Sequence, residues 1–264
     1  MHPPHRSLSH ILQSPGMHEE KIPEFFHGDV KFTGNLPVFE NPLCIMAFTN
    51  RCGSNLLGEY LRQTQKIGGF YESLNHDTVQ ATSDNSSFKS FPEYIMGIFD
   101  RFSVDKQFGI KASLDQLLML SRWNVLGMFP AVNVVHIRRL DVVSQAVSHW
   151  IAHQTKRWTS MQKETDIEPI YDYMRIDKVV LDTNFSNSTI PIVARALNMN
   201  YLDVVYEDLT RDPKGVLTSI GDSISLDLSD WHPKNPKLSR QANDINQEFA
   251  ERYILELSSV MKPI

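Results

Sequence analysis

A short polar segment, Thr49–Asn55, follows the apolar run Leu43–Phe48 and carries Arg51, Gly53 and Ser54 ahead of an amphipathic stretch. A strand that enters a helix through such a turn points several backbone N–H groups at one place, where the helix dipole adds positive potential. Phosphate or sulfate binds at such a place. The turn differs from a nucleoside-triphosphate loop, which needs Gly-x-x-x-x-Gly-Lys followed by Ser or Thr. The segment therefore predicts an anion site for a phosphorylated donor other than ATP.

A second cationic segment begins with Arg138 and Arg139, which follow the valine-rich run Ala131–Ile137. In the helix expected next, Ser144 and Ser148 are four residues apart and share a polar face. A guanidinium at a strand end and hydroxyls on the following helix can hold a phosphate together. Two anion sites suit a nucleotide that is phosphorylated at two places.

Predicted strands and helices alternate along the chain, which favours an α/β fold with a doubly wound parallel sheet. Strands are expected at residues 43–48, 108–112, 131–137 and 202–206. Helices are expected at residues 55–63, 92–102, 114–123, 141–153, 212–220 and 239–260, with 160–195 mostly helical and 76–90 a loop or lid. We expect a single P-loop-like domain at residues 31–264, with a central parallel sheet flanked by helices on both sides. Ligands of such sheets bind beyond the carboxyl ends of the strands, so both cationic segments fall on one edge.

Composition narrows the class of protein. The chain has 264 residues, a net charge of −5 and a pI near 6.0, which argues against generic nucleic-acid binding. Its two cysteines, Cys44 and Cys52, fit neither a disulfide framework nor a metal site and indicate a reducing compartment. The sequence contains no run of eighteen apolar residues, so we expect no membrane span. Residues 1–30 lack the apolar core of a signal peptide, so we expect a leader there, either disordered or packed on a partner, and a cytoplasmic location.

Four blocks of this sequence resemble the sulfotransferases that use 3′-phosphoadenosine 5′-phosphosulfate (PAPS), most closely the trehalose 2-sulfotransferase type. The blocks are Asn50–Leu57, Gly68–Glu72, His136–Trp158 and Arg240–Ala242 with Glu251–Tyr253 beyond it. The resemblance implies PAPS as the co-substrate, no metal, and a hydroxyl acceptor that is a carbohydrate or a glycolipid-like small molecule. It also implies a homodimer.

The resemblance further implies a role for each matching residue. Glu72 would be the general base, Lys111 would assist it, and Arg51 would stabilise the charge that develops on the leaving group. The residues that would bind the 5′-phosphosulfate are Arg51, Cys52, Gly53, Ser54 and Asn55. Arg139 and Ser148 would hold the 3′-phosphate, with Ser144 or Gln145 close by. Arg240 would close over the nucleotide, and either Trp158 or Tyr206 would stack on adenine.

Some of these residues also have a structural interpretation with no functional role. Arg138 fits an ordinary surface charge, Cys52 a small space-filler, and Trp158 a core aromatic. The segment around Glu72 departs from the family pattern, which leaves acceptors other than trehalose open. Two other functions also stay open: a small-molecule kinase that uses ATP and magnesium, and a non-catalytic nucleotide-binding homologue.

Overall fold

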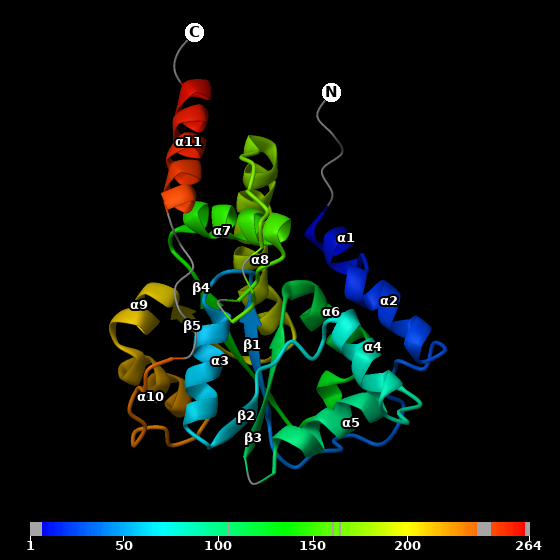
Figure 1. Cartoon of the computed structure of the whole chain (residues 1–264). Coiled ribbons are helices and arrows are strands. Elements are labelled where there is room, and N and C mark those ends of the chain that lie inside the picture. The colour runs from blue at the N-terminus through cyan, green and yellow to red at the C-terminus, as the bar shows by residue number, and fades with distance from the viewer. Residues whose placement is uncertain (1–6, 105, 160, 164, 237–243, 262–264) are drawn as a thin grey trace.

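The structure is a computed structural model that describes residues 7–104, 106–159, 161–163, 165–236 and 244–261 (Figure 1). Its centre is a five-stranded parallel sheet in the order β2-β3-β1-β4-β5. The strands are β1 (Leu43–Phe48), β2 (Ile67–Gly69), β3 (Gln107–Ala112), β4 (Val132–Arg138) and β5 (Asn200–Val205). The predicted fold class, an α/β domain with a central parallel sheet, is confirmed.

Helices connect these strands. Their bounds are α1 (Leu8–Gln13), α2 (Met17–Phe25), α3 (Ser54–Gln63), α4 (His76–Asp84), α5 (Phe91–Phe102), α6 (Leu114–Arg122), the 3-10 helix η1 (Leu126–Met128), α7 (Val142–Thr155), α8 (Tyr173–Ala196), α9 (Tyr206–Arg211), α10 (Pro213–Ser223) and α11 (Asp244–Val260). No helix among the described residues has both the length and the apolar character needed to cross a membrane.

Both faces of the sheet are covered, which the burial of β1 shows most directly. All six residues of this strand are buried. Its side chains alternate between two apolar clusters, because successive side chains of a strand point to opposite faces. Leu43, Ile45 and Ala47 join the cluster formed with α2, α5, α6 and the end of α8, and the other three join the cluster with α3, α9 and α10. A continuous apolar strand is therefore needed at this position.

The chain order places both cationic segments on one edge of the sheet. β1 pairs in parallel with β4, and Phe48 lies opposite Ile137 at the carboxyl ends of the two strands. From β1 the chain continues to β3 and β2 on one side, whereas β4 and β5 lie on the other. The loops after β1 and β4 thus leave the sheet where the strand order reverses, which is where ligands of such sheets bind.

The N-terminal segment differs from the predicted leader. Residues 8–13 and 17–25 form α1 and α2, and Ile22, Phe26 and Val30 are buried in the main apolar cluster. Figure 1 shows both helices beside α4 and α6. The described part of residues 1–30 is therefore packed on the domain itself, through Ile22 of α2 and two residues that follow this helix.

The local structure departs from the predictions in several places. The predicted loop or lid at 76–90 contains α4, capped by the Asn75 side chain, and only two residues of this polar helix are buried. The segment 160–195 is mostly helical, as predicted, because α8 covers Tyr173–Ala196, but residues 161–163 and 165–172 are not helical. The segment directly after β5 forms the short helix α9. The three-residue strand β2 is too short to give a periodic signal.

Candidate active site

The loop between β1 and α3 has the backbone of an anion-binding turn. Arg51 and Gly53 both have positive φ angles, 66° and 95°, and Gly53 is the N-cap of α3. Within the loop, the Cys52 N–H donates to the Thr49 carbonyl over 3.3 Å. The first N–H groups of an α-helix have no carbonyl partner within the helix. The start of α3 thus offers donors to an anion, at the carboxyl end of β1.

Two side chains from distant helices fix this loop. Gln145 of α7 is fully buried, and its Nε2 donates to Thr49 Oγ1 over 2.9 Å and to the Asn50 carbonyl over 2.7 Å. Asn187 of α8 accepts a hydrogen bond of 3.4 Å from Thr49 Oγ1. These contacts hold the loop at its first two residues, before the positive φ angle of Arg51. Gln145 was predicted near the 3′-phosphate as the alternative to Ser144, whereas Asn187 was not among the predicted site residues.

Arg51 leans from the loop towards α7. Its Nε donates to Ser148 Oγ over 2.9 Å, and its Nη1 donates to the Trp158 carbonyl. Burial is the main cause that lowers the pKa of Arg51, and the positive charge of Arg139 lowers it further. The structure thus brings together the predicted residues Arg51, Ser148 and Arg139. Two neighbouring guanidiniums repel each other, and an anion bound between them would relieve that repulsion.

Arg139 and Tyr206 close the loop on its other side. A Cβ atom on Gly53 would overlap the Tyr206 ring, so this ring packs directly on the glycine. The guanidinium carbon of Arg139 lies 5.6 Å from the centre of the same ring. Arg139 pairs with Asp141 at 3.5 Å, and its buried Nε lies 4.0 Å from Glu207 Oε1 but has no hydrogen-bond partner among the described residues. A buried donor without an acceptor is costly, and a bound phosphate oxygen would satisfy it.

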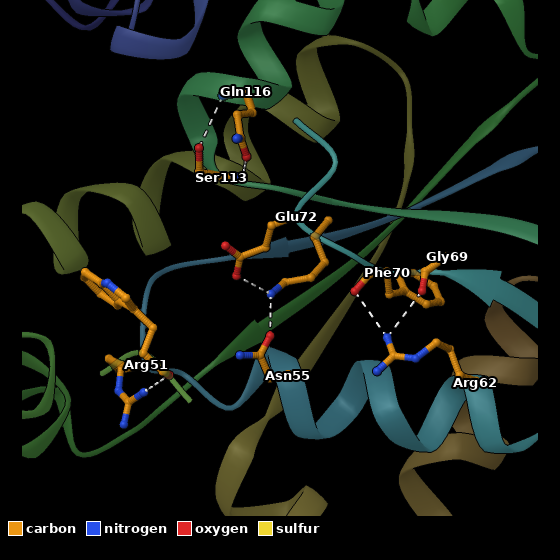
Figure 2. A network of polar contacts seen from close by, with 10 residues as sticks. Arg51, Asn55, Arg62, Gly69, Phe70, Glu72, Ser113 and Gln116 are labelled. Atoms are coloured by element: carbon orange, nitrogen blue, oxygen red, sulfur yellow. Dashed lines mark hydrogen bonds and ion pairs between the residues drawn. The ribbon is translucent and has the colours of Figure 1, made fainter. Parts of the chain in front are cut away.

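Lys111 of β3 joins the loop to the predicted general base. Its Nζ lies 2.7 Å from Asn55 Oδ1 and 3.0 Å from Glu72 Oε1 (Figure 2). Lys111 is 1% exposed and its Nζ lies 4.5 Å from the centre of the Phe48 ring, whereas the Glu72 side chain is 53% exposed. A buried ammonium therefore links a residue of the loop to a carboxylate that solvent and substrate can reach.

The backbone before Glu72 is fixed by glycine geometry. Gly69 has a φ angle of 91°, and a Cβ atom there would overlap the Gly109 carbonyl of β3. Arg62 of α3 donates from Nη1 to the Gly69 and Phe70 carbonyls, both over 3.3 Å, as Figure 2 shows. The chain then turns, and the Asn75 N–H donates to the Glu72 carbonyl over 3.1 Å. The block Gly68–Glu72 thus places its carboxylate beside Lys111.

The side chains of Arg51 and Lys111 lie on different sides of the loop. In Figure 2 the Arg51 side chain points away from Asn55 and Glu72, the two residues that Lys111 contacts. Arg51 and Ser148 instead line a cavity of about 410 Å³ whose other walls are Ile151, Ala152, Thr155, Arg157, residues 165–169, Ile245 and Asn246. The site therefore has one region with a carboxylate and an ammonium, and another with guanidiniums and a hydroxyl.

The other predicted site residues are placed as follows. The Ser144 hydroxyl lies away from this cavity, because Ser144 lines a separate hollow between α7 and α11. The Trp158 ring packs on His149 with centroids 5.6 Å apart, so of the two adenine candidates only Tyr206 packs on the loop. Cys52 is fully buried, which raises the pKa of its thiol. Arg240 lies outside the described residues.

Two further observations complete the description of the site. Arg138 forms a bidentate ion pair with Asp203, with N–O distances of 2.7 to 2.9 Å, and stays at the surface as the plain interpretation predicts. Within the described ranges, no group of three His, Cys, Asp or Glu side chains is placed to hold a metal ion.

Comparisons with known proteins show the family of the chain. A model of the Stf0 sulphotransferase family matches residues 113–256, more than half of the chain. Trehalose 2-sulfotransferase of Mycobacterium tuberculosis is 31% identical over 137 residues, which are 50% of this chain and 49% of the relative. The enzyme of the same name from Mycolicibacterium smegmatis is 32% identical over 131 residues, 49% of this chain and 48% of the relative. The chain thus spans about half the length of the curated relatives it matches.

A solved sulfotransferase from Alicyclobacillus acidocaldarius superposes with a TM-score of 0.47 and 14% identity, over 86% of this chain and 98% of its own. That likeness is too distant to carry an argument. The family match begins after β3, so it includes Arg139, Ser148 and Tyr206 but neither Glu72 nor Lys111.

Proposed function

The chain belongs to the Stf0 sulphotransferase family, and we propose that it transfers a sulfuryl group from PAPS to a hydroxyl of a carbohydrate or glycolipid-like acceptor. The observation that carries this proposal is the position of Lys111. This buried ammonium contacts Asn55 at the start of α3 and Glu72, the candidate base, at 2.7 and 3.0 Å. Transfer of a group from a donor anion to an acceptor hydroxyl requires that the donor and the acceptor be held close together, and Lys111 contacts a residue on each side.

The residues of the loop region fit the donor. PAPS carries a phosphosulfate and a separate 3′-phosphate, and the chain has guanidiniums and helix N–H groups for two anions. We assign the phosphosulfate to the start of α3 at Gly53, Ser54 and Asn55. Ser148 and Arg139 bind the 3′-phosphate, and Arg51, which contacts Ser148 over 2.9 Å, contributes on that side. The unsatisfied Nε of Arg139 supports this assignment.

In the proposed reaction the donor supplies the sulfuryl group and leaves as adenosine 3′,5′-bisphosphate. The acceptor oxygen forms a bond to sulfur while the bond from sulfur to the bridging phosphate oxygen breaks. Glu72 takes the proton that the acceptor hydroxyl loses. Lys111 orients the Glu72 carboxylate and stabilises the negative charge that develops on the leaving oxygen, a role that a preorganised buried cation performs well. Because Arg51 points the other way, we propose Lys111 as the main cation at the reacting atoms.

The acceptor is proposed from chemistry and from the names of the relatives. Both curated relatives are named as acting on trehalose, a sugar. The exposed half of the Glu72 carboxylate is open to a solvated hydroxyl, as a polyhydroxy acceptor requires. A homodimer remains part of the proposal, on the family resemblance.

Calorimetry with adenosine 3′,5′-bisphosphate and transfer of label from radiolabelled PAPS test this function. We expect tight binding of the bisphosphate without added metal, and labelled product with at least one sugar or glycolipid. Preference for ATP with magnesium would overturn the proposal in favour of a kinase. Bisphosphate binding without turnover across the acceptor panel would instead support a non-catalytic nucleotide-binding homologue.

A further inference from the structure

Two histidines from separate helices meet beside the Glu72 turn. His18 of α2 and His76, the first residue of α4, have their Nδ1 atoms 2.8 Å apart and ring centroids 5.0 Å apart. His76 directly follows Asn75, whose N–H closes the turn on the Glu72 carbonyl. α2 therefore packs against the end of the segment that carries the proposed base.

Hydrogen bonding fixes which nitrogen of each ring carries a proton. The backbone N–H of His76 donates to His18 Nδ1 over 3.2 Å, so this nitrogen must accept. The nearby Nδ1 of His76 must then be the donor of the contact between the rings. Its Nε2, left as an acceptor, receives the Lys21 ammonium at 3.1 Å and lies 3.4 Å from Asp77 Oδ1, which shares the charge of that ammonium. In the resulting neutral tautomer, the proton of His18 is on Nε2.

The charges around His18 keep it in this form. Burial is the main cause that lowers its pKa, followed by His76, and Lys21 acts in the same direction. Asp77 and Glu72 oppose the shift. At neutral pH, His18 therefore presents an N–H donor close to the turn that carries the proposed base, and no described residue accepts from it.

We infer that α2 supplies an acceptor-binding residue, with His18 donating its Nε2–H to an oxygen of the polyhydroxy acceptor whose reacting hydroxyl is deprotonated by Glu72. This inference rests on the proposed function. α2 lies outside the residues that match the family, so the match assigns no role to it. His18 thereby helps to select the acceptor, while the donor is bound elsewhere by Arg139 and Ser148.

Two substitutions separate this role from a structural one. His18→Asn places an amide oxygen near the Nδ1 position and keeps an acceptor for the His76 N–H, but it loses the Nε2 donor. His18→Gln extends an amide N–H to the Nε2 position. His27→Asn, an exposed histidine at the end of the same segment with a φ angle of 50°, is the matched control.

The measurement is transfer from radiolabelled PAPS to trehalose and to a panel of mono- and disaccharides and glycolipids, with calorimetry of adenosine 3′,5′-bisphosphate. We expect His18→Asn to raise the KM for the best acceptor roughly three- to tenfold, with bisphosphate affinity and melting temperature unchanged. His18→Gln should recover part of that loss, and His27→Asn should match the wild type. An acceptor KM that His18→Asn leaves unchanged overturns the inference alone.

The proposed function fails in a different way. A wild type that transfers label to no member of the panel overturns it, and the inference with it. If His18→Asn lowers the melting temperature and both KM values rise together, His18 is a structural residue and the inference is wrong.

Discussion

Arg51 Nε lies 2.9 Å from Ser148 Oγ, although the two residues are 97 positions apart in the chain. The contact joins the loop after β1 to α7, the helix that follows β4. Since both residues belong to the proposed 3′-phosphate site, each one positions the other for the nucleotide.

We expect a double-mutant cycle of Arg51→Gln and Ser148→Ala to show coupling in nucleotide binding. Loss of a hydrogen bond from a charged group should weaken adenosine 3′,5′-bisphosphate binding by roughly tenfold to a hundredfold for Arg51→Gln. Ser148→Ala should cost less, and the double variant less than the sum, with a coupling of about 1 kcal/mol. Calorimetry measures all four affinities. Strict additivity would show that the two residues bind separate groups.

Lys111→Met should remove most of the turnover while the fold is kept. Methionine fills the space of the lysine stem, and Glu72 is half exposed, so no buried charge is left without a partner. Removal of one preorganised donor at the reacting atoms lowers kcat by roughly a hundredfold to a thousandfold. Lys106→Met, at an exposed lysine just before β3, is the control. Turnover within a few-fold of the wild type would rule out the role proposed for Lys111.

Glu72→Gln should lower kcat by roughly a hundredfold to ten-thousandfold, the range expected for loss of a general base. The amide keeps the shape and an oxygen for Lys111, so bisphosphate affinity should stay near that of the wild type. Steady-state kinetics with the best acceptor of the panel, alongside calorimetry, check both statements. Full activity of this variant would exclude Glu72 as the base.

Gly53→Ala should disable the loop, and Gly28 offers a matched comparison. Both glycines have positive φ angles, 95° and 87°, but only at Gly53 would a Cβ atom meet another group, the Tyr206 ring. Gly28→Ala should cost about 1 kcal/mol of unfolding free energy from backbone strain. Gly53→Ala should cost roughly 1 to 3 kcal/mol more and weaken bisphosphate binding. Equal losses in urea denaturation would show that Tyr206 moves aside freely.

His149 should make the protein less stable in mild acid. Burial, His153 and Arg51 lower its pKa to about 4 from an ordinary value near 6.5. A lowered pKa means that the unfolded chain binds the proton more readily, so this stability is complete above pH 6.5 and is lost as the pH falls towards 4. Between pH 7 and pH 5 the loss should be about 2 kcal/mol.

Urea denaturation of His149→Gln at the two pH values should show a smaller loss than the wild type by that amount. His27→Gln, at an exposed histidine, should keep the wild-type dependence. An unchanged pH dependence in His149→Gln would show that other groups are responsible.

Much of the fold follows from the sequence because β1 is apolar throughout and β4 is centred on an apolar run. Such a run is needed in a strand buried on both faces, and the predicted bounds of β1 are those of the structure. The loop with Arg51 and Gly53 could be predicted for the same reason, since it directly follows such a strand.

The contacts between distant elements could not be predicted in this way. Gln145 holds the loop across 96 positions, and His18 meets His76 across 58. Each pair depends on how separate elements of the fold pack, which residue spacing along one helix does not specify. The polar helix α4 could not be predicted from the spacing of apolar residues, because a helix with only two buried residues has no clear apolar face.

The buried residues of α2 and of the segment after it show that the family match and the apolar core have different boundaries. Ile22, Phe26 and Val30 fill the same apolar cluster as Phe91 and Tyr94, and the rings of Phe26 and Phe91 lie 6.1 Å apart. A fragment cut at the edge of the family match, or at residue 31, would uncover these aromatic rings and leave a void beside α5. The segment that matches the family model is therefore smaller than the unit that packs as one apolar core, and transplanting that segment alone into another protein should yield an aggregating chain.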